Sequence, residues 1–216
     1  MEAKKMICYT IGHSTRKLEE FINIIKNYGI DCIMDVRSNP HASSSYDKSY
    51  DRDSLEMNIK QSGINYIYMG EQLGEKRTEN EVLDSDGKAN FDKIMECSTF
   101  NKGINRIVEG IRRGHKIALM CSERNPFNCH RSIVLGYALM KNGVDMEHII
   151  DEKKSKSQNR IEEEIFITYE PVLKDKFLQL SIQDVLDNDD YDNINPKDIK
   201  VEVIEEGYRR KFREAE

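Results

Sequence analysis

The chain has 216 residues, of which 38% are hydrophobic and 33% charged, and its formal net charge is −6. This composition predicts a polar globular protein with one domain and an extension, or barely two domains. The net negative charge argues against binding along an extended nucleic-acid duplex, although a local basic pocket is compatible with it. No apolar run approaches the roughly 20 residues of a membrane span. No signal peptide precedes the first strand, so we expect a cytoplasmic protein that does not contact membranes.

Strands and helices alternate along the first 150 residues. Strands are predicted over residues 6–11, 30–40, 64–70 and 116–121, with a short fifth strand at 144–150. Helical periodicity lies between them at 16–28, 53–62, 90–113 and 131–143, the third helix broken near 98–103. Ser14 or Thr15 is expected to cap the first helix and Gly29 to end it. Residues 41–51 are expected to form a mobile loop able to cover a site, and 71–88 a long charged loop.

The alternating pattern of predicted strands and helices ends after Asp151. A charged linker and helix are predicted to residue 166, then a short helix over 176–186, an acidic linker over 187–196 and a terminal helix. We therefore divide the chain into an α/β domain, residues 1–168, and a mostly helical extension, residues 169–216. The extension is expected to pack on the main domain or to contribute to contacts in a homo-oligomer.

This alternation predicts an α/β fold with a mostly parallel sheet and helices on both faces, a Rossmann-like arrangement of three layers. Right-handed crossovers place the carboxyl ends of the parallel strands on one edge, where ligands bind in such folds. Polar side chains follow four of the predicted strands. They are His13, Ser14 and Arg16 after the first, Asp35, Arg37, Ser38 and His41 after the second, Glu71 after the third, and Cys121, Glu123, Cys129, His130 and Arg131 after the fourth.

Cys121 is the candidate nucleophile among them. A thiolate is favoured by nearby cations and by a helix N-terminus, which His13, His130 and Arg131 are placed to supply. We predict catalytic roles for Cys121, Glu123, His13 and His130. Two alternatives stay open: Cys121 is a small apolar residue that ends a buried strand, or Cys129 is the reactive thiol or a resolving partner in a reversible disulfide.

The remaining polar residues are predicted to bind the substrate. Asp35 and Arg37 lie on the same side of a strand, so they form a structural ion pair or share a ligand. Arg131 begins a helix and is expected either to bind an anion or to clamp its loop. The full predicted binding set is Ser14, Arg16, Asp35, Arg37, His41, Cys129 and Arg131.

A metal site competes for the same side chains. Cys121, Cys129 and His130, with His13 or His41, would make a zinc shell of two cysteines and two histidines. The spacing is not a standard zinc signature, so we predict no metal ligand, and the sequence identifies no cofactor. The other three cysteines, Cys8, Cys32 and Cys97, are predicted to be reduced structural residues.

Four motifs in matching order resemble the DUF488 family, a domain of unknown function. They are TIGHS at 10–14, DVRSNP at 35–40, LGEKR at 73–77 and LMCSERNPFNCHR at 119–131, and the resemblance runs from Met6 to Phe166. It implies no defined activity. A weaker likeness, at the level of the fold alone, is to rhodaneses and cysteine phosphatases, whose Cys-containing loop also leads to an arginine at a helix start.

Three functions remain open from the sequence. The first is an enzyme with a Cys/His/Arg site acting on a small anionic or nucleotide-like substrate. The second is a non-catalytic module that binds a nucleotide or the end of a nucleic acid. The third is a redox or metal protein that uses Cys121 and Cys129.

Overall fold

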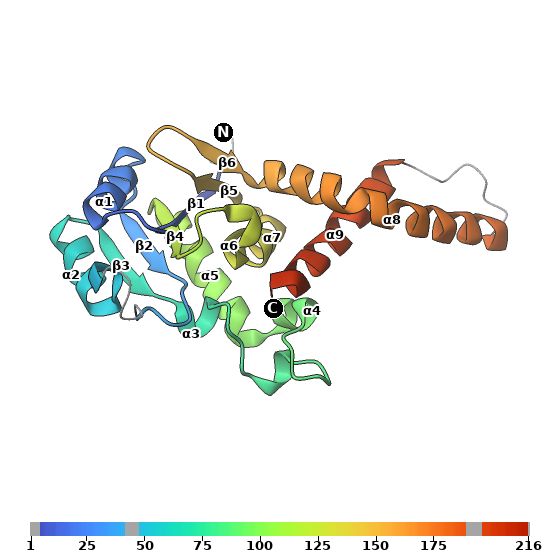
Figure 1. The fold of residues 1–216 in the computed structure, drawn as a ribbon, viewed down its shortest axis with the longest axis horizontal. Helices are drawn as coiled ribbons and strands as arrows, with labels where there is room; N and C mark the ends of the chain where they lie inside the picture. The colour runs from blue at the N-terminus through green and yellow to red at the C-terminus, as the bar shows by residue number, and fades with distance from the viewer. Residues whose placement is uncertain (1–4, 42–47, 189–195, 216) are drawn as a thin grey trace. The chain divides into compact units, whose positions relative to one another are not determined.

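The computed structural model describes residues 5–41, 48–188 and 196–215 (Figure 1). Within residues 174–198 only the secondary structure of these residues is described, and elsewhere the side chains are described as well. Contacts divide the chain into two compact units, Met1–Gln158 and Asn159–Glu216. The predicted domain boundary at residue 168 falls inside the helix α8, Gln158–Asn188. None of the described helices is long and apolar enough to cross a membrane.

A single six-stranded sheet forms the centre of the first unit. Its strand order is β3-β2-β4-β1-β5-β6, and every strand is parallel to its neighbours except β6, which is antiparallel to β5. The strands are β1 (Ile7–Gly12), β2 (Cys32–Asp35), β3 (Asn65–Tyr68), β4 (Ile117–Cys121), β5 (Asp145–Ile149) and β6 (Ser155–Ser157). Because β1 and β4 are central, both are buried by neighbours on either side.

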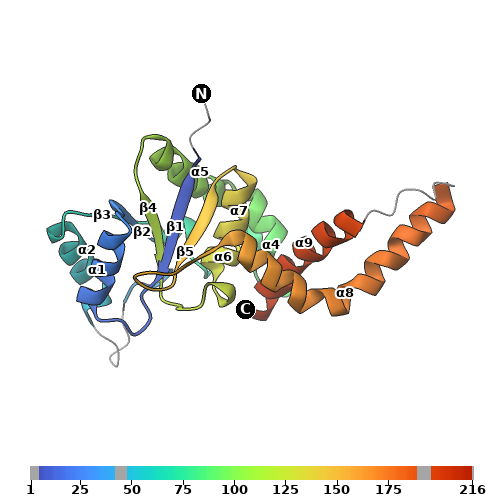
Figure 2. The same ribbon diagram turned by 90° about the horizontal axis from the view of Figure 1, so that it is seen from above.

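Helices cover both faces of this sheet (Figure 2). The α-helices of the first unit are α1 (Leu18–Asn27), α2 (Arg52–Gln61), α3 (Gly70–Leu73), α4 (Phe91–Glu96), α5 (Ser98–Arg112), α6 (His130–Ile133) and α7 (Leu135–Lys141). Short 3₁₀ turns are η1 (Lys48–Tyr50), η2 (Asn80–Val82) and η3 (Pro126–Asn128). The α/β fold class predicted from the alternating pattern is confirmed.

The two faces have separate apolar layers. On one face, α1 and α2 bury residues such as Phe21 and Leu55 in a cluster with Ile11, Ile33 and Met120 from the strands. On the other face, α5 contacts β4 and α7 contacts β5. Burial of a large aliphatic or aromatic side chain contributes about 1.5–3 kcal/mol. These layers therefore fix the strands whose ends carry the polar residues.

Several local predictions need correction. Lys17, not Ser14 or Thr15, is the N-cap residue of α1, and it makes no side-chain cap hydrogen bond. Ser14 instead adopts a left-handed conformation with φ 50°, and its N–H donates to Ser122 O at 3.0 Å. The turn after β1 is thus tied to the loop after β4. Ser14 and Thr15, the two hydroxyl-bearing residues of this turn, therefore lie outside α1.

Two predicted irregular segments contain regular structure. The charged loop at 71–88 includes most of α3 and all of η2. The linker after Asp151 contains β6, which pairs with Glu147–Ile149 of β5. No apolar alternation marks β6, because the sequence of this edge strand is Ser-Lys-Ser and its pairing uses backbone groups. The predicted division into two helices is confirmed, but the break lies at Cys97, between Glu96 of α4 and Ser98 of α5, and the residues 98–103 expected to form it belong to α5.

The second unit is built from most of α8 and from α9, Pro196–Ala215. The two helices predicted between residues 151 and 186 are in fact one helix, α8. Ile161, Ile165, Tyr169 and Leu173 are buried at a spacing of four residues and form an apolar stripe along it. In α9, a Cβ atom at Gly207 would lie 2.4 Å from Ile165 Cγ2, so glycine is needed for the close approach of these helices.

A buried polar network links β1, β5, the start of α8 and α6 in the first unit. Gln158 Nε2 donates to Ser132 O at 2.9 Å, so Gln158 Oε1 accepts from His148 Nε2 at 2.7 Å. Thr10 Oγ1 then donates to His148 Nδ1 at 2.7 Å. His148 is fully buried, and its pKa is lowered to about 3 by burial and by the positive charge of Arg131. The ring is therefore neutral at pH 7.

We predict that His148 makes the stability of the first unit dependent on pH. Its folded pKa lies below the unfolded value of 6.5, so its full contribution is present above pH 6.5 and declines as the pH falls toward 3. As the pH falls, the free energy of unfolding should decrease less steeply in His148→Gln than in the wild type. The two slopes should differ by up to about 1.4 kcal/mol per pH unit. Urea denaturation from pH 7 to pH 4 checks this, and equal slopes for both proteins would contradict it.

Candidate functional site

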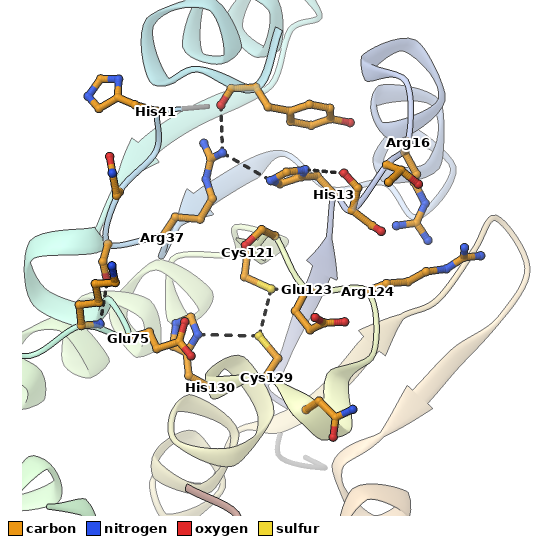
Figure 3. Close-up of a pocket in the computed structure, with 18 of the residues that line it drawn as sticks. His13, Arg16, Arg37, His41, Glu75, Cys121, Glu123, Arg124, Cys129 and His130 are labelled. Carbon is orange, nitrogen blue, oxygen red and sulfur yellow. Dashed lines mark hydrogen bonds between the residues drawn. The ribbon is translucent and has the colours of Figure 1, made fainter. Parts of the chain in front are cut away.

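A pocket of about 880 Å³ lies at the carboxyl edge of the sheet (Figure 3). The segments after β1, β2 and β4 converge there, as the topology predicted. Its lining residues are His13, Ser14, Thr15, Arg16, Lys17, Arg37, Ser38, Asn39, His41, Tyr50, Glu75, Lys76, Cys121, Ser122, Glu123, Arg124, Asn128, Cys129 and His130.

Close contact between two loops shapes the floor of this pocket. His13 N–H donates to Cys121 O at 2.9 Å, which continues the pairing of β1 with β4 beyond the strand end. A Cβ atom at Gly12 would lie 1.7 Å from Glu123 O, so only glycine allows the loop after β4 to fold back here. Glycine is therefore required at position 12 because the loop between Cys121 and Cys129, called here the cysteine loop, passes close to it.

Two cysteines meet at the end of β4. Cys121 is the last residue of the strand, and Cys129 is the N-cap residue of α6. The turn η3 between them begins at Pro126, and Asn125 caps it by accepting from Phe127 N. This turn brings Cys121 Sγ and Cys129 Sγ to 3.1 Å, although eight positions separate them in the sequence. Both thiols are free and buried, and both line the pocket.

Arg131 lies beneath this pair and is completely buried. Its Nη1 donates to Cys121 Sγ at 2.7 Å and also to Glu123 O, while Nη2 donates to Arg124 O at 2.9 Å. Arg131 does not line the pocket. Of its two predicted roles, this placement agrees with the loop clamp, because the guanidinium binds the loop carbonyls.

These contacts separate the acidities of the two thiols. Burial raises the pKa of Cys121, but the hydrogen bond from Cys129 and the positive charge of Arg131 outweigh it and lower the pKa to about 7. The hydrogen bond to Cys121, followed by burial, holds the pKa of Cys129 well above its usual range. The lowered pKa favours the thiolate of Cys121 near neutral pH, and Cys129 is the thiol that donates to it.

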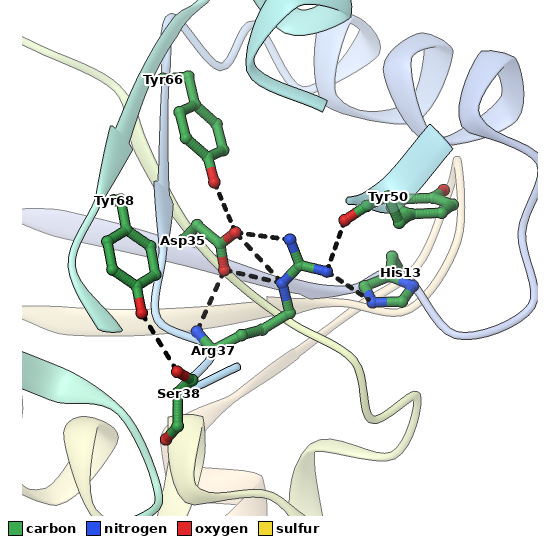
Figure 4. Close-up of polar contacts among 7 residues, drawn as sticks. All are labelled: His13, Asp35, Arg37, Ser38, Tyr50, Tyr66 and Tyr68. Atoms are coloured by element: carbon green, nitrogen blue, oxygen red, sulfur yellow. Dashed lines mark hydrogen bonds and ion pairs between the residues drawn. The ribbon is translucent and has the colours of Figure 1, made fainter. Parts of the chain in front are cut away.

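Arg37, which lines the pocket, forms a buried ion pair with Asp35 (Figure 4). Arg37 Nη2 lies 2.6 Å from Asp35 Oδ2, and Arg37 Nε donates to Asp35 Oδ1 at 2.9 Å. Tyr66 Oη donates to Asp35 Oδ2 at 2.7 Å, and Arg37 Nη1 donates to Tyr50 O at 2.9 Å. Asp35 is fully buried and is not a lining residue. Of the two predicted roles for this pair, the geometry agrees with the structural ion pair.

His13 is held by its neighbours rather than by Cys121. Its ring stacks on Tyr50 with centroids 4.2 Å apart, and Nδ1 contacts Ser14 O at 3.0 Å. Nε2 lies 3.5 Å from Arg37 Nη1 and must be the acceptor, because a guanidinium only donates. Burial and the charge of Arg37 lower the pKa of His13 to about 4. His13 is thus neutral at pH 7 and cannot supply the positive charge proposed for it beside the thiolate.

His130 contacts the second cysteine. Its Nδ1 lies 3.8 Å from Cys129 Sγ (Figure 3). Burial, followed by the charges of Arg131 and Arg77, lowers the pKa of His130 to about 4. The ring is therefore neutral at pH 7, and its Nδ1 lies beside the thiol of Cys129. Of the three groups expected to favour a Cys121 thiolate, only Arg131 is positively charged at neutral pH.

The other predicted site residues differ in how far their side chains are available to contact a ligand in the pocket. Ser14 and His41 line the pocket, and His41 is exposed. Arg16 also lines it, but its guanidinium donates to Gly12 O and Ile150 O. The carboxylate of Glu123 is exposed at the pocket and accepts from Asn125 N at 2.9 Å.

Ten of the lining residues were outside the predicted catalytic and binding sets, and they include Lys17, Tyr50, Lys76 and Arg124. Lys17 and Arg124 follow strand ends closely, so the rule that identified Arg16 and Glu123 was sufficient to find them. Tyr50 carried no such signal, because it belongs to a polar segment, and its ring is placed by stacking on His13 and by an edge-to-face contact with Phe21. In the described part of the chain, no three His, Cys, Asp or Glu residues are grouped to hold a metal ion.

We predict that the charge of Arg131 sets the reactivity of Cys121. In Arg131→Met the pKa of the thiol should return to about 8.5 or higher, which slows alkylation by iodoacetamide at pH 7 by roughly 10-fold or more. Arg131→Lys keeps the charge and should retain a lowered pKa. The rate is measured on the peptide that contains Cys121, with circular dichroism as the control for folding. Equal rates in wild type and a folded Arg131→Met would contradict this assignment.

Comparison with known families identifies the family of this chain. The family model described as "Domain of unknown function DUF488" matches residues 17–138, which is more than half of the 216-residue chain. Comparison with curated proteins and with solved structures finds no match. The matched segment includes Arg37, the cysteine loop and Arg131. The chain therefore belongs to the DUF488 family.

Proposed function

We propose that this protein is a cysteine-dependent enzyme that acts on a small anionic substrate, with Cys121 as the nucleophile. The observation that carries the proposal is the buried contact of 2.7 Å between Arg131 Nη1 and Cys121 Sγ at the base of an open pocket. A neutral structural cysteine at the end of a buried strand does not require a positive charge beside its sulfur. A thiolate does, because burying an unpaired charge is costly.

The charge of the pocket lining supports an anionic substrate. Five lining residues are cationic and two are acidic, although the chain as a whole carries −6. Arg16 and Arg37 are held by backbone carbonyls or by Asp35, so they contribute mainly to the local potential. The exposed cations are Lys17, Lys76 and Arg124. A cleft lined by one sign of charge concentrates ligands of the opposite sign.

The proposed reaction needs no imidazole base to form the nucleophile. The contacts of Cys121 with Arg131 and Cys129 lower its pKa and favour the thiolate near neutral pH. Its sulfur would bond to the electrophilic atom of the substrate while the leaving group departs with its electron pair. Water would then cleave the new sulfur bond and restore the thiol. Glu123 has an exposed carboxylate at the same pocket and is our candidate for proton transfer in these steps.

We predict that Cys121→Ser lowers turnover at least 100-fold, because a serine hydroxyl is not ionised near pH 7. The probes are p-nitrophenyl phosphate, sulfate and acetate, whose common leaving group absorbs visible light and needs no protonation. Cys97→Ser is the matched control, because Cys97 is the N-cap residue of α5 and serine is favoured there. Equal activity in folded Cys121→Ser would contradict the role of the thiol.

We also predict that the exposed cations bind the substrate. Lys76→Gln with Arg124→Gln should raise KM for p-nitrophenyl phosphate several-fold and leave kcat within about 2-fold, because the lost attraction is common to the bound and transition states. Lys102→Gln with Lys116→Gln removes two exposed charges that do not line the pocket and should change neither constant. Phosphate that raises the melting temperature without any turnover of these probes would instead favour a non-catalytic binding module.

A further inference from the structure

The proposed reaction uses one thiol and leaves the role of the second unexplained. Cys129 Sγ lies 3.1 Å from Cys121 Sγ and donates to it, and it borders the same pocket. A disulfide bond is about 2.05 Å long, so the two sulfurs need to approach by only about 1 Å to be joined. We propose that Cys121 and Cys129 form a dithiol that reduces hydroperoxides and closes to a reversible disulfide. The proposal shares the Cys121 thiolate with the proposed function, but not the anionic substrate.

The first step takes place at Cys121. Its thiolate attacks the terminal oxygen of a hydroperoxide, a sulfur–oxygen bond forms, and the oxygen–oxygen bond breaks. The sulfur is oxidised by two electrons to a sulfenic acid, and the peroxide leaves as an alkoxide that takes up a proton to become an alcohol. A thiolate with a pKa near the ambient pH suits this attack, because it is substantially ionised yet remains nucleophilic.

The second step uses Cys129 and His130. The pKa of Cys129 is raised by its contact with Cys121 and by burial, so this thiol needs a base before it can attack. His130 Nδ1 is 3.8 Å away, and its ring is neutral at pH 7. As Cys129 Sγ bonds to Cys121 Sγ, the sulfur–oxygen bond of the sulfenic acid breaks, and the proton of Cys129 passes by way of His130 to the departing oxygen, which leaves as water. One hydroperoxide and two thiols thus give an alcohol, water and one disulfide.

The surroundings of the pair can accommodate the oxidised state. Closure removes the thiolate that Arg131 contacts, but the guanidinium keeps its bonds to Glu123 O and Arg124 O. These bonds hold both ends of the loop while the charge on sulfur disappears. A small dithiol or a dithiol protein would return the pair to its reduced form by thiol–disulfide exchange. The cycle therefore needs only a hydroperoxide and a dithiol.

The other cysteines are poor competitors for the oxidant. Burial holds the pKa of Cys8 above its usual range and raises the pKa of Cys32 to about 11. Cys97 is buried and donates to Glu81 Oε1 at 3.1 Å. Low concentrations of peroxide should therefore modify the cysteine loop selectively.

Trypsin digestion tests this proposal directly, because Arg124 lies between the two cysteines. The full chain is treated with one equivalent of cumene hydroperoxide, its intact mass is measured, and the remaining thiols are then blocked with N-ethylmaleimide before digestion. We expect a loss of 2 Da from the intact mass and a disulfide between peptides 117–124 and 125–131. Dithiothreitol should reverse both changes, and with dithiothreitol present each chain should consume more than one equivalent of peroxide.

Variants separate the two steps. Cys129→Ser should give a sulfenic acid that dimedone traps at Cys121 and that excess peroxide converts to a sulfinic acid, with no 2 Da loss. His130→Asn should retain the first step but accumulate more dimedone adduct than wild type, because closure is slower. Cys97→Ser should behave as wild type. Cys121→Ser should show neither the adduct nor the disulfide.

Two results would overturn the proposal. One is a wild-type protein that accumulates sulfinic acid without forming the disulfide, and the other is a Cys121 that does not react with the peroxide. Either can occur while Cys121 still turns over p-nitrophenyl phosphate, which leaves the proposed function intact. Conversely, disulfide formation without turnover of any p-nitrophenyl ester would support the dithiol and count against the proposed function.

Discussion

The buried guanidinium of Arg131 is the constraint on which the candidate site depends. It joins Cys121 Sγ to two carbonyls of the loop that follows the same strand. One side chain therefore sets the charge on the thiol and the path of the loop that presents it. Removing one partner of a buried charge pair typically costs about 3–5 kcal/mol, so the shape and chemistry of this loop change together.

The rest of the first unit holds this arrangement in place. Gly12 leaves room for Glu123 O, and hydrogen bonds from His13 and Ser14 tie the turn after β1 to the loop after β4. Asp35, which accepts from Tyr66, holds Arg37 at the side of the pocket. The nearby imidazoles are kept neutral by burial, so cationic charge at the thiol comes from Arg131 alone among the groups expected to supply it. Reactivity at Cys121 is in this way separated from the titration of histidine.

The sequence was sufficient to predict the parallel sheet and the edge at which polar residues converge. Alternating apolar runs and helical periods encode both, since parallel strands direct their carboxyl ends to one side. The details that escaped prediction depend on long-range contacts. Tyr50 is placed by stacking on His13, β6 by backbone pairing with β5, and the N-cap of α1 by the tie between Ser14 and Ser122. None of these contacts leaves a periodic mark in the sequence.

The same limit applies to the roles within the site. The spacing from Cys121 to Arg131 placed both residues in one loop, but it did not distinguish an arginine that binds substrate from one that binds the thiol. That distinction needs the turn at Pro126, which folds the loop so that Arg131 lies beneath Cys121 instead of in the pocket. The turn also brings Cys129 against Cys121, which separates the acidities of two otherwise similar thiols.

The ionisation of Cys121 in the native protein is the direct test of whether Arg131 stabilises a thiolate at this position. The rate of alkylation of Cys121 by iodoacetamide is measured from pH 5 to pH 9 on the tryptic peptide 117–124, which contains no other cysteine, so the titration belongs to this thiol alone. A midpoint near pH 7 is the result that the contact with Arg131 predicts. A midpoint at or above about 8.5, the value of an unperturbed cysteine, would show that the guanidinium does not stabilise a thiolate and would contradict the account.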